Sequence, residues 1–242
     1  YCANDIDPTP TITGLGGGTF SSGAGLSINA STGVVDVSAS TPGTYTVTYA
    51  TTGSCPNSSS VTVTVNAGDD ASFNYSAASF CTDDSDPIPT ITGLSGGSFS
   101  AGAGLLINVS TGTVDVSAST PGTYTVTYAT AGACPNSSGV TVTVNALDDA
   151  SFNYSAASYC TNELDPTPTI TGLAGGTFSS SAGLSINVST GVIDLSASAP
   201  NTYTVSYTTS GSCPNTSNVN VTVNAGTSVT FTALSALCID AG

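Results

Sequence analysis

The chain has 242 residues and a formal charge of −15, because it contains 15 Asp and Glu residues but no Lys, Arg or His. A chain without cationic side chains cannot neutralise phosphate groups, which makes nucleic acid and anionic membrane surfaces poor partners. It also lacks the His and Lys that commonly activate a nucleophile, so we expect no enzyme, with no catalytic and no cofactor-binding residues.

The sequence repeats itself with a period of 79 residues. Two sets of cysteines mark this period: Cys2, Cys81 and Cys160, and then Cys55, Cys134 and Cys213. One small β-sandwich fits this period. We define repeat 1 as residues 1–67, repeat 2 as 68–146, repeat 3 as 147–225, and the start of a fourth repeat as 226–242. Repeat 1 lacks the segment that precedes the first cysteine in the other copies, so it should lack its first strand. We therefore expect the sequence to be a window from a longer array.

Short alternating runs of Val, Ile, Thr, Tyr and Phe predict β-strands along the whole chain. In repeat 2 the predicted strands are, in chain order, 72–75, 89–93, 96–100, 104–108, 113–117, 123–128 and 140–144. No apolar run is long enough for a membrane-spanning helix, so we expect no membrane insertion. The predicted fold class is all-β, with tandem immunoglobulin-like or cadherin-like β-sandwich domains in an elongated array.

Turn residues support this fold. The sequence "STG" at 31–33 and its copies places Gly where a hairpin loop needs a positive φ. Before the strand 123–128, Gly122 becomes Asn201 in repeat 3, which also predicts a positive φ at that position. The tyrosine that follows, Tyr124 in repeat 2, stands where immunoglobulin-like domains have a tyrosine corner, although an ordinary core tyrosine would also fit.

The repeated cysteines, in a chain without His or a CxxC motif, indicate disulfides in an oxidising compartment rather than a zinc site. Bonds within each repeat are the preferred pairing: Cys2–Cys55, Cys81–Cys134 and Cys160–Cys213. A second pairing links the first cysteine of one repeat to the second cysteine of the next, as Cys2–Cys134 and Cys81–Cys213. Pairing of Cys55 with Cys81 is disfavoured. Under the two schemes that remain, Cys238 has no partner in this sequence.

The carboxylates gather after the first cysteines and at the boundaries between repeats. Two groups could form where repeats meet: Asp5, Asp7, Asp69 and Asp70, and then Asp84, Asp86, Asp148 and Asp149. Carboxylate oxygens at a flexible linker suit Ca²⁺, which would stiffen the array. The alternative is that these residues are solvated loop residues that keep the protein soluble. Apart from this possible Ca²⁺ we expect no cofactor.

The stretch "GLSINASTGVVDVSASTPGTYTVTYATTGSCPNSSSVTVTV" (25–65) resembles the Ig-like tandem repeats of giant cell-surface adhesins of Bacteroidetes. These are adhesins of the gliding-motility SprB type, secreted by the type IX system. The resemblance extends over all three repeats, and it implies an extracellular, cell-surface filament used in cell adhesion. It carries over no binding or catalytic residue.

We therefore expect a spacer or shaft whose partners are the neighbouring repeats of the same chain. The absence of Lys and Arg removes trypsin-type cleavage sites, which suits a protease-rich environment. The alternative is that the repeats are themselves adhesive modules that bind a glycan or another surface. An exposed patch of aromatic side chains would favour that alternative.

Overall fold

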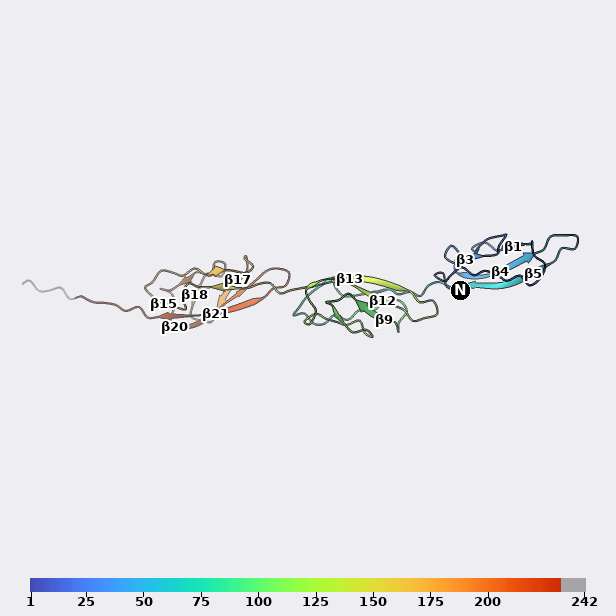
Figure 1. Cartoon of the computed structure of the whole chain (residues 1–242). Coiled ribbons are helices and arrows are strands. Elements are labelled where there is room, and N and C mark those ends of the chain that lie inside the picture. The colour runs from blue at the N-terminus through green and yellow to red at the C-terminus, as the bar shows by residue number, and fades with distance from the viewer. Residues whose placement is uncertain (232–242) are drawn as a thin grey trace, which may run out of the picture. The chain divides into compact units, whose positions relative to one another are not determined.

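The computed structural model describes residues 1–231 (Figure 1). All regular secondary structure in these residues is β-strand, which confirms the predicted all-β class. The chain divides into two compact units, Tyr1–Asn145 with repeats 1 and 2, and Ala146–Gly242 with repeat 3.

Repeat 2 is a complete β-sandwich. Its strands are β6 (Phe73–Asn74), β7 (Ser79–Cys81), β8 (Thr90–Ile91), β9 (Ser98–Ala101), β10 (Leu106–Ile107), β11 (Val114–Asp115), β12 (Gly122–Ala129) and β13 (Ser137–Asn145). One layer is the four-stranded sheet β7-β13-β12-β9, and the pairs β6-β8 and β10-β11 pack against it. Each of the seven predicted strands has a counterpart, and β7 is the strand that the sequence pattern did not predict.

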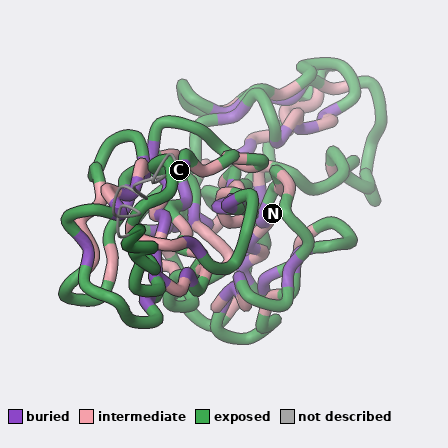
Figure 2. Tube along the Cα trace, turned by 90° about the vertical axis from the view of Figure 1, so that its left-hand side faces the viewer, coloured by how far each residue is buried: buried purple, intermediate pink, exposed green. Residues whose placement is uncertain are grey.

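The core follows from the alternation of side chains along β12 and β13, because successive residues of a strand point to opposite faces. Val126, Tyr128 and Val142 are fully buried. On the outer face, the hydroxyls of Thr123 and Thr143 lie 3.1 Å apart across the two strands. Figure 2 shows the resulting pattern of short buried segments among exposed loops. Burying one such Val or aromatic side chain contributes about 1.5–3 kcal/mol.

Repeat 3 has the same architecture as repeat 2. Its strands are β14 (Phe152–Asn153), β15 (Ser158–Cys160), β16 (Thr169–Ile170), β17 (Thr177–Ser180), β18 (Ser185–Ile186), β19 (Ile193–Asp194), β20 (Asn201–Thr208) and β21 (Thr216–Asn224). The sheet order β15-β21-β20-β17 repeats that of repeat 2, and the buried core contains the equivalent residues.

Repeat 1 is an incomplete version of this sandwich. It has the strands β1 (Thr19–Ser22), β2 (Ser27–Ile28), β3 (Val35–Asp36), β4 (Gly43–Ala50) and β5 (Ser58–Val65). No strand corresponds to β6 or β8, and a single parallel bridge from Cys2 to Asn66 stands in place of β7. Its buried core is correspondingly smaller.

The tyrosine corner is confirmed in every repeat. The hydroxyl groups of Tyr45, Tyr124 and Tyr203 donate to the backbone carbonyl four residues upstream, at 2.5, 2.6 and 2.6 Å. These bonds fix the loop that enters β4, β12 and β20. The core-tyrosine alternative is therefore not needed.

One turn prediction is confirmed and one is wrong. Gly33 has a φ of 73°, and its counterparts in repeats 2 and 3 have φ values of 73° and 70°. Gly122 and Asn201, however, do not have a positive φ. They are the first residues of β12 and β20 and pair with the ends of β13 and β21, so they are already extended.

Candidate functional site

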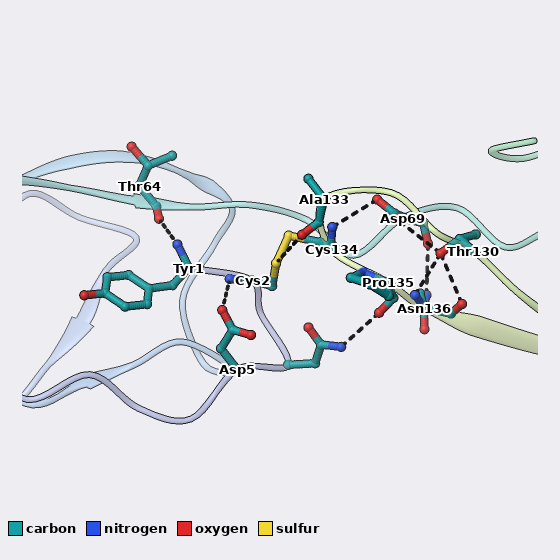
Figure 3. Close-up of a disulfide and its surroundings, with 11 residues drawn as sticks. Tyr1, Cys2, Asp5, Thr64, Asp69, Thr130, Ala133, Cys134, Pro135 and Asn136 are labelled. Carbon is teal, nitrogen blue, oxygen red and sulfur yellow. Dashed lines mark hydrogen bonds between the residues drawn. A yellow bond between two sulfur atoms is a disulfide. The ribbon is translucent and has the colours of Figure 1, made fainter. Parts of the chain in front are cut away.

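The most distinctive feature of the first unit is a disulfide that joins repeat 1 to repeat 2. Cys2 bonds to Cys134, with an S–S distance of 1.95 Å and a Cα–Cα distance of 5.4 Å (Figure 3). Cys2 lies beside Asn66, at the point where the chain leaves repeat 1. Cys134 lies in the loop that precedes β13. The bond therefore closes the boundary between two sandwiches.

The preferred pairing within each repeat is wrong. Cys2 bonds to Cys134, so the pairs Cys2–Cys55 and Cys81–Cys134 cannot form. Cys160 is a free thiol whereas Cys213 is disulfide-bonded, which excludes the third pair, Cys160–Cys213.

Strand β7 supplies the physical reason. It pairs in parallel with the end of β13, so that Cys81 lies opposite Asn145. Cys134 lies before the beginning of the same strand. β13 has nine residues, and a strand rises about 3.3 Å per residue. The two cysteines of one repeat thus lie at opposite ends of the sandwich, roughly 25 Å or more apart, far beyond the reach of a disulfide.

The second pairing that the sequence left open agrees with the structure at Cys2–Cys134. Cys81 and Cys213, the cysteines that occupy the same places one period later, are also disulfide-bonded. Among the described residues, Cys55 and Cys160 are free thiols. Cys238 lies outside the residues that the structure describes.

Hydrogen bonds support the disulfide on both sides (Figure 3). The Asn4 side-chain amide donates to the Pro135 carbonyl across the boundary, at 3.1 Å. On the repeat 2 side, the backbone amide of Asp69 donates to the Cys134 carbonyl at 2.8 Å, and Asn136 Nδ2 donates to the Asp69 carbonyl at 3.0 Å. Since only Ala67 and Gly68 separate Asn66 from Asp69, little free chain remains between the two sandwiches.

The side chain of Asp69 organises the loop that carries Cys134. It accepts a hydrogen bond from Thr130 Oγ1 at 3.0 Å and one from the Cys134 amide at 3.4 Å. Thr130 is only 6% exposed, and its hydroxyl has two acceptors within reach, the Asp69 carboxylate and, at 3.2 Å, the Asn136 carbonyl. Asp148 has the same function in repeat 3, where it accepts from Thr209 Oγ1 and from the Gly211 amide.

Each of the other carboxylates that were candidate calcium ligands accepts a hydrogen bond from a backbone amide of its own repeat. Asp5 and Asp84 accept from the amides of Cys2 and Cys81, both at 2.7 Å. The remaining four accept from amides as follows: Asp7 from Val37, Asp86 from Val116, Asp70 from Ser72, and Asp149 from Ser151.

This arrangement does not fit a calcium site. Within residues 1–231 no group of three or more acidic, His or Cys side chains is placed to hold a metal ion. Each carboxylate instead accepts hydrogen bonds on its own. Four of them do so within local turns, namely Asp5, Asp70, Asp84 and Asp149. The other four accept from residues at least 30 positions away, namely Asp7, Asp69, Asp86 and Asp148. Hydrogen bonds from the side chain and the amide of the serine two residues later lower the pKa of Asp70 and Asp149.

Exposed aromatic side chains, which a glycan-binding surface would need, are scarce. Among the described residues, Tyr1 and Phe231 are the exposed aromatics, and they come from opposite ends of the sequence. No exposed aromatic patch exists on repeats 2 and 3. Likewise, no helix in the described part of the chain could cross a bilayer.

Asn4, Thr130 and Asn136 were not predicted from the sequence as residues of the boundary. A signal was present, because "TTGSCPN" (51–57), "TAGACPN" (130–136) and "TSGSCPN" (209–215) keep Thr and Asn at fixed distances from the second cysteine. In each loop the Thr hydroxyl bonds to the Asn backbone, as in Thr130 and Asn136.

Comparison with known proteins gives a likeness of fold. No family model matches the sequence, and no curated protein matches it. Mouse cadherin-23 repeats EC22–24 are similar, with 17% identity and a TM-score of 0.30 over 90% of this chain and 89% of that one. Drosophila N-cadherin EC1–4 is similar with 12% identity and a TM-score of 0.33, over 87% of this chain and 67% of that one. The fold class rests on the strand pairing of this chain itself, and no property of these cadherins is carried over.

Proposed function

We propose that this chain is a spacer segment of an extracellular surface protein, in which successive β-sandwiches are stapled to one another by disulfides. The observation that carries the proposal is the Cys2–Cys134 bond. A bond between sandwiches does little for the interior of either one. It restricts how the two can separate, which is the property that a spacer needs.

Three further observations support this role. Disulfides persist in oxidising surroundings, which favours an extracellular location. The chain has no Lys or Arg, so proteases that cleave after these residues find no site. The aromatic side chains of repeats 2 and 3 lie in the cores or at the tyrosine corners rather than in a binding surface.

The more specific form of the proposal is a shaft segment of a gliding-motility adhesin that is exported by type IX secretion. The sequence resemblance of residues 25–65 supports this form. A test is to express the chain with a type IX signal in a gliding bacterium and to examine the cell surface with an antibody.

Calcium is not needed in this proposal, because the carboxylates already accept hydrogen bonds from the protein. A glycan array with the purified chain would test the alternative adhesive role. Specific binding there would contradict the spacer proposal.

Stretching of single molecules tests the spacer role directly. The Cys2–Cys134 bond closes a loop of 132 residues, and each residue contributes at most about 3.4 Å to an extended chain. Reduction of this bond should therefore lengthen the fully stretched chain by up to about 450 Å. If reducing agent leaves the stretched length unchanged, no staple is present.

Site-directed variants give a matched control. Cys134→Ser should remove about 5 kcal/mol from the unfolding free energy of the closed loop, in the chain-entropy view of disulfides. Cys55→Ser changes the equivalent cysteine of repeat 1, which is a free thiol, and should change nothing. Peptide mapping of the unreduced protein with chymotrypsin should recover Cys2 linked to Cys134. Recovery of Cys2 linked to Cys55 instead would contradict the proposal.

A further inference from the structure

The sequence contains nine Asn-x-Ser/Thr tripeptides, which the spacer proposal leaves unused. They begin at Asn29, Asn57, Asn74, Asn108, Asn136, Asn153, Asn187, Asn215 and Asn220. This tripeptide is the acceptor for N-linked sugars in secreted proteins, and the sugar is bulky, so it needs an asparagine nitrogen that faces solvent. A chain rich in Asn, Ser and Thr contains such tripeptides by chance. The structure has to distinguish those that can carry a sugar.

Two of these asparagines use their side-chain nitrogen to hold a cysteine loop. Nδ2 of Asn136 donates to the Asp69 carbonyl, and Nδ2 of Asn215 donates to the Asp148 carbonyl, both at 3.0 Å. Their Oδ1 atoms accept from the amides of the next residues, at 2.9 and 2.8 Å. A sugar on Nδ2 would replace one of its two protons and crowd the backbone that it binds. These two asparagines therefore serve the fold.

Three other asparagines lie inside strands. Asn74 and Asn153 belong to β6 and β14, and each stands between two buried aromatic residues. Asn220 belongs to β21, where its Oδ1 accepts from Thr204 Oγ1 at 3.0 Å across the sheet. Because N-linked sugars favour surface loops, these positions are less suited than an asparagine in a loop.

A set of three asparagines lies in an exposed loop that recurs in every repeat. Asn29 follows β2, Asn108 follows β10, and Asn187 follows β18. Each asparagine is exposed, and so is the serine two residues later that completes the tripeptide. The same candidate acceptor thus appears once in each of the three sandwiches.

The side-chain oxygen of each asparagine in this set is fixed, whereas the nitrogen is not. Asn108 Oδ1 accepts from the amides of Ser110 and Thr111, at 2.9 and 3.0 Å. The two corresponding distances are both 3.0 Å at Asn29, and they are 3.0 and 2.9 Å at Asn187. Within residues 1–231, Nδ2 of these asparagines has no protein partner. The nitrogen is therefore left to solvent.

The backbone of the loop is anchored independently of this nitrogen. The Asn108 amide donates to the Thr113 carbonyl at 2.9 Å, and the Gly112 amide donates to the Asn108 carbonyl at 2.8 Å. The Phe99 amide donates to the Val109 carbonyl at 2.8 Å, which ties the loop to β9. Repeats 1 and 3 have the same three bonds. Since none of them uses Nδ2, a sugar on this atom breaks no contact of the fold.

The residue inside the tripeptide gives a second observation. Val109 and Val188 are 59% and 57% exposed, whereas the other valines of repeats 2 and 3 are buried or half-buried. The apolar face of a sugar ring on the neighbouring asparagine can cover such a side chain and remove it from water. Repeat 1 has the smaller Ala30 at this position.

We propose that Asn29, Asn108 and Asn187 are N-glycosylation sites. The donor is a sugar activated by a phosphate leaving group, carried on a lipid or on a nucleotide. Nδ2 attacks the anomeric carbon, so that a C–N bond forms and the C–O bond to the phosphate breaks. The phosphate leaves with the electron pair of that bond, and Nδ2 releases one proton. A transferase of the exporting cell catalyses this step, and the chain is its acceptor.

The inference rests on the extracellular location in the spacer proposal and adds a surface property to it. Each sandwich gains one bulky, hydrated group, at a period of 79 residues. Such a group hinders proteases that cleave near exposed apolar residues. The absence of Lys and Arg gives no protection against these proteases.

The test uses the full chain recovered from the outside of the cell that makes it. Cleavage by chymotrypsin after Leu and Tyr places Asn29, Asn108 and Asn187 on three separate peptides. Mass spectrometry should find a sugar on each of them, and none on Asn136 or Asn215. Release by an amidase that cuts the bond between Asn and sugar should leave Asp at each site. An oligosaccharide identifies a lipid-linked donor and a single hexose a nucleotide-linked one, and either result supports the sites.

Ser110→Ala removes the acceptor tripeptide without removing a contact. The Ser110 hydroxyl has no protein partner among the described residues, and the bond to Asn108 Oδ1 comes from the Ser110 amide. The variant should lower occupancy at Asn108 at least tenfold and leave Asn29 and Asn187 unchanged. Ser110→Thr keeps the tripeptide and should keep the sugar. Equal melting temperatures of the unglycosylated variant and the unglycosylated original chain would exclude a folding defect.

Three outcomes would overturn the inference. The first is that Asn29, Asn108 and Asn187 are unmodified in the exported chain. This leaves the spacer proposal standing, because the disulfide and the stretched length do not depend on sugars. The second is a sugar on Asn108 that persists in Ser110→Ala. The third is a sugar that alkaline elimination removes, which would lie on a hydroxyl. A chain found only inside the cell would instead contradict the spacer proposal itself, and the inference with it.

Discussion

Repeats 1 and 2 have nearly the same sequence from the first cysteine onward, yet their cores differ. In both, the two long strands pair in the same register, with Val47 opposite Val61 and Val126 opposite Val140. Tyr128 is fully buried, but its counterpart Tyr49 is only half-buried. The difference is strand β6, which is present in repeat 2 alone. The sheet can form without this strand, but the core cannot be closed.

The loops that carry the second cysteine also differ between repeats 1 and 2. Gly53 in repeat 1 has a φ of 144°, whereas the equivalent Gly132 does not have a positive φ. In repeat 2 the side chain of Asp69 lies so close to Gly132 that an added Cβ would meet a carboxylate oxygen at 2.5 Å. The conformation of this loop thus depends on residues that come before the first cysteine.

The largest expected effect is that of Phe73→Ala, which should make repeat 2 resemble repeat 1. Removal of this buried ring should cost about 3–5 kcal/mol. Hydrogen exchange of the β12 and β13 amides measures the loss locally. The control is Phe231→Ala, which truncates a ring that is 90% exposed and should change stability by less than about 0.5 kcal/mol. Unchanged protection in the Phe73 variant would show that β6 does not close the core.

Tyr75→Phe should have an intermediate effect. The Tyr75 hydroxyl donates to the Gly112 carbonyl at 2.5 Å, and its loss should cost about 1 kcal/mol. Repeat 1 has no such tyrosine, so its stability should not change.

The same tyrosine gives repeat 2 an alkaline dependence. Burial raises the pKa of Tyr75 from 10.0 to about 12. Between these two values the unfolded state loses its proton first, so the stability of repeat 2 should fall as the pH rises from 10 to 12. Tyr75→Phe should flatten this part of the curve in a pH series of denaturation experiments. A slope that persists in the variant would assign the effect to another group.

A smaller difference in stability is expected when the same substitution is made at two equivalent valines. Val140→Thr places a hydroxyl at a half-buried position and should cost roughly 1 kcal/mol. Val61→Thr makes the same change at a position that is 61% exposed and should be nearly neutral. Equal costs in thermal melts would mean that Val61 is as buried in solution as Val140.

The smallest effect should be that of calcium. The boundary carboxylates already accept hydrogen bonds from the protein, so melts in millimolar Ca²⁺ and in EDTA should coincide. An increase of several degrees in Ca²⁺ would restore the calcium hypothesis.

The fold was predictable because its signals are local. Alternation along 123–128 and 140–144 predicts the two long strands, and the position of Tyr124 predicts its corner. Strand β7 was not predictable, since three residues that pair in parallel with a strand some 60 positions away leave no periodic pattern. The wrong disulfide pairing followed from this omission. The sequence did show where the carboxylates gather. It did not show their role, because Asp69 and Asp84 would have the same sequence pattern as calcium ligands or as hydrogen-bond acceptors in loops. Only their placement in the structure distinguishes the two functions.

The parallel pairing of β7 with β13 has a mechanical consequence. β7 is the second strand of repeat 2 and β13 is the last, and bonds such as Thr143 N to Ala78 O and Thr82 N to Asn145 O join them. Tension that reaches β7 at its first residue and β13 at its last residue slides these strands along each other, so the ladder is loaded in shear and its hydrogen bonds must break together. A sandwich with antiparallel terminal strands would instead unzip one bond at a time.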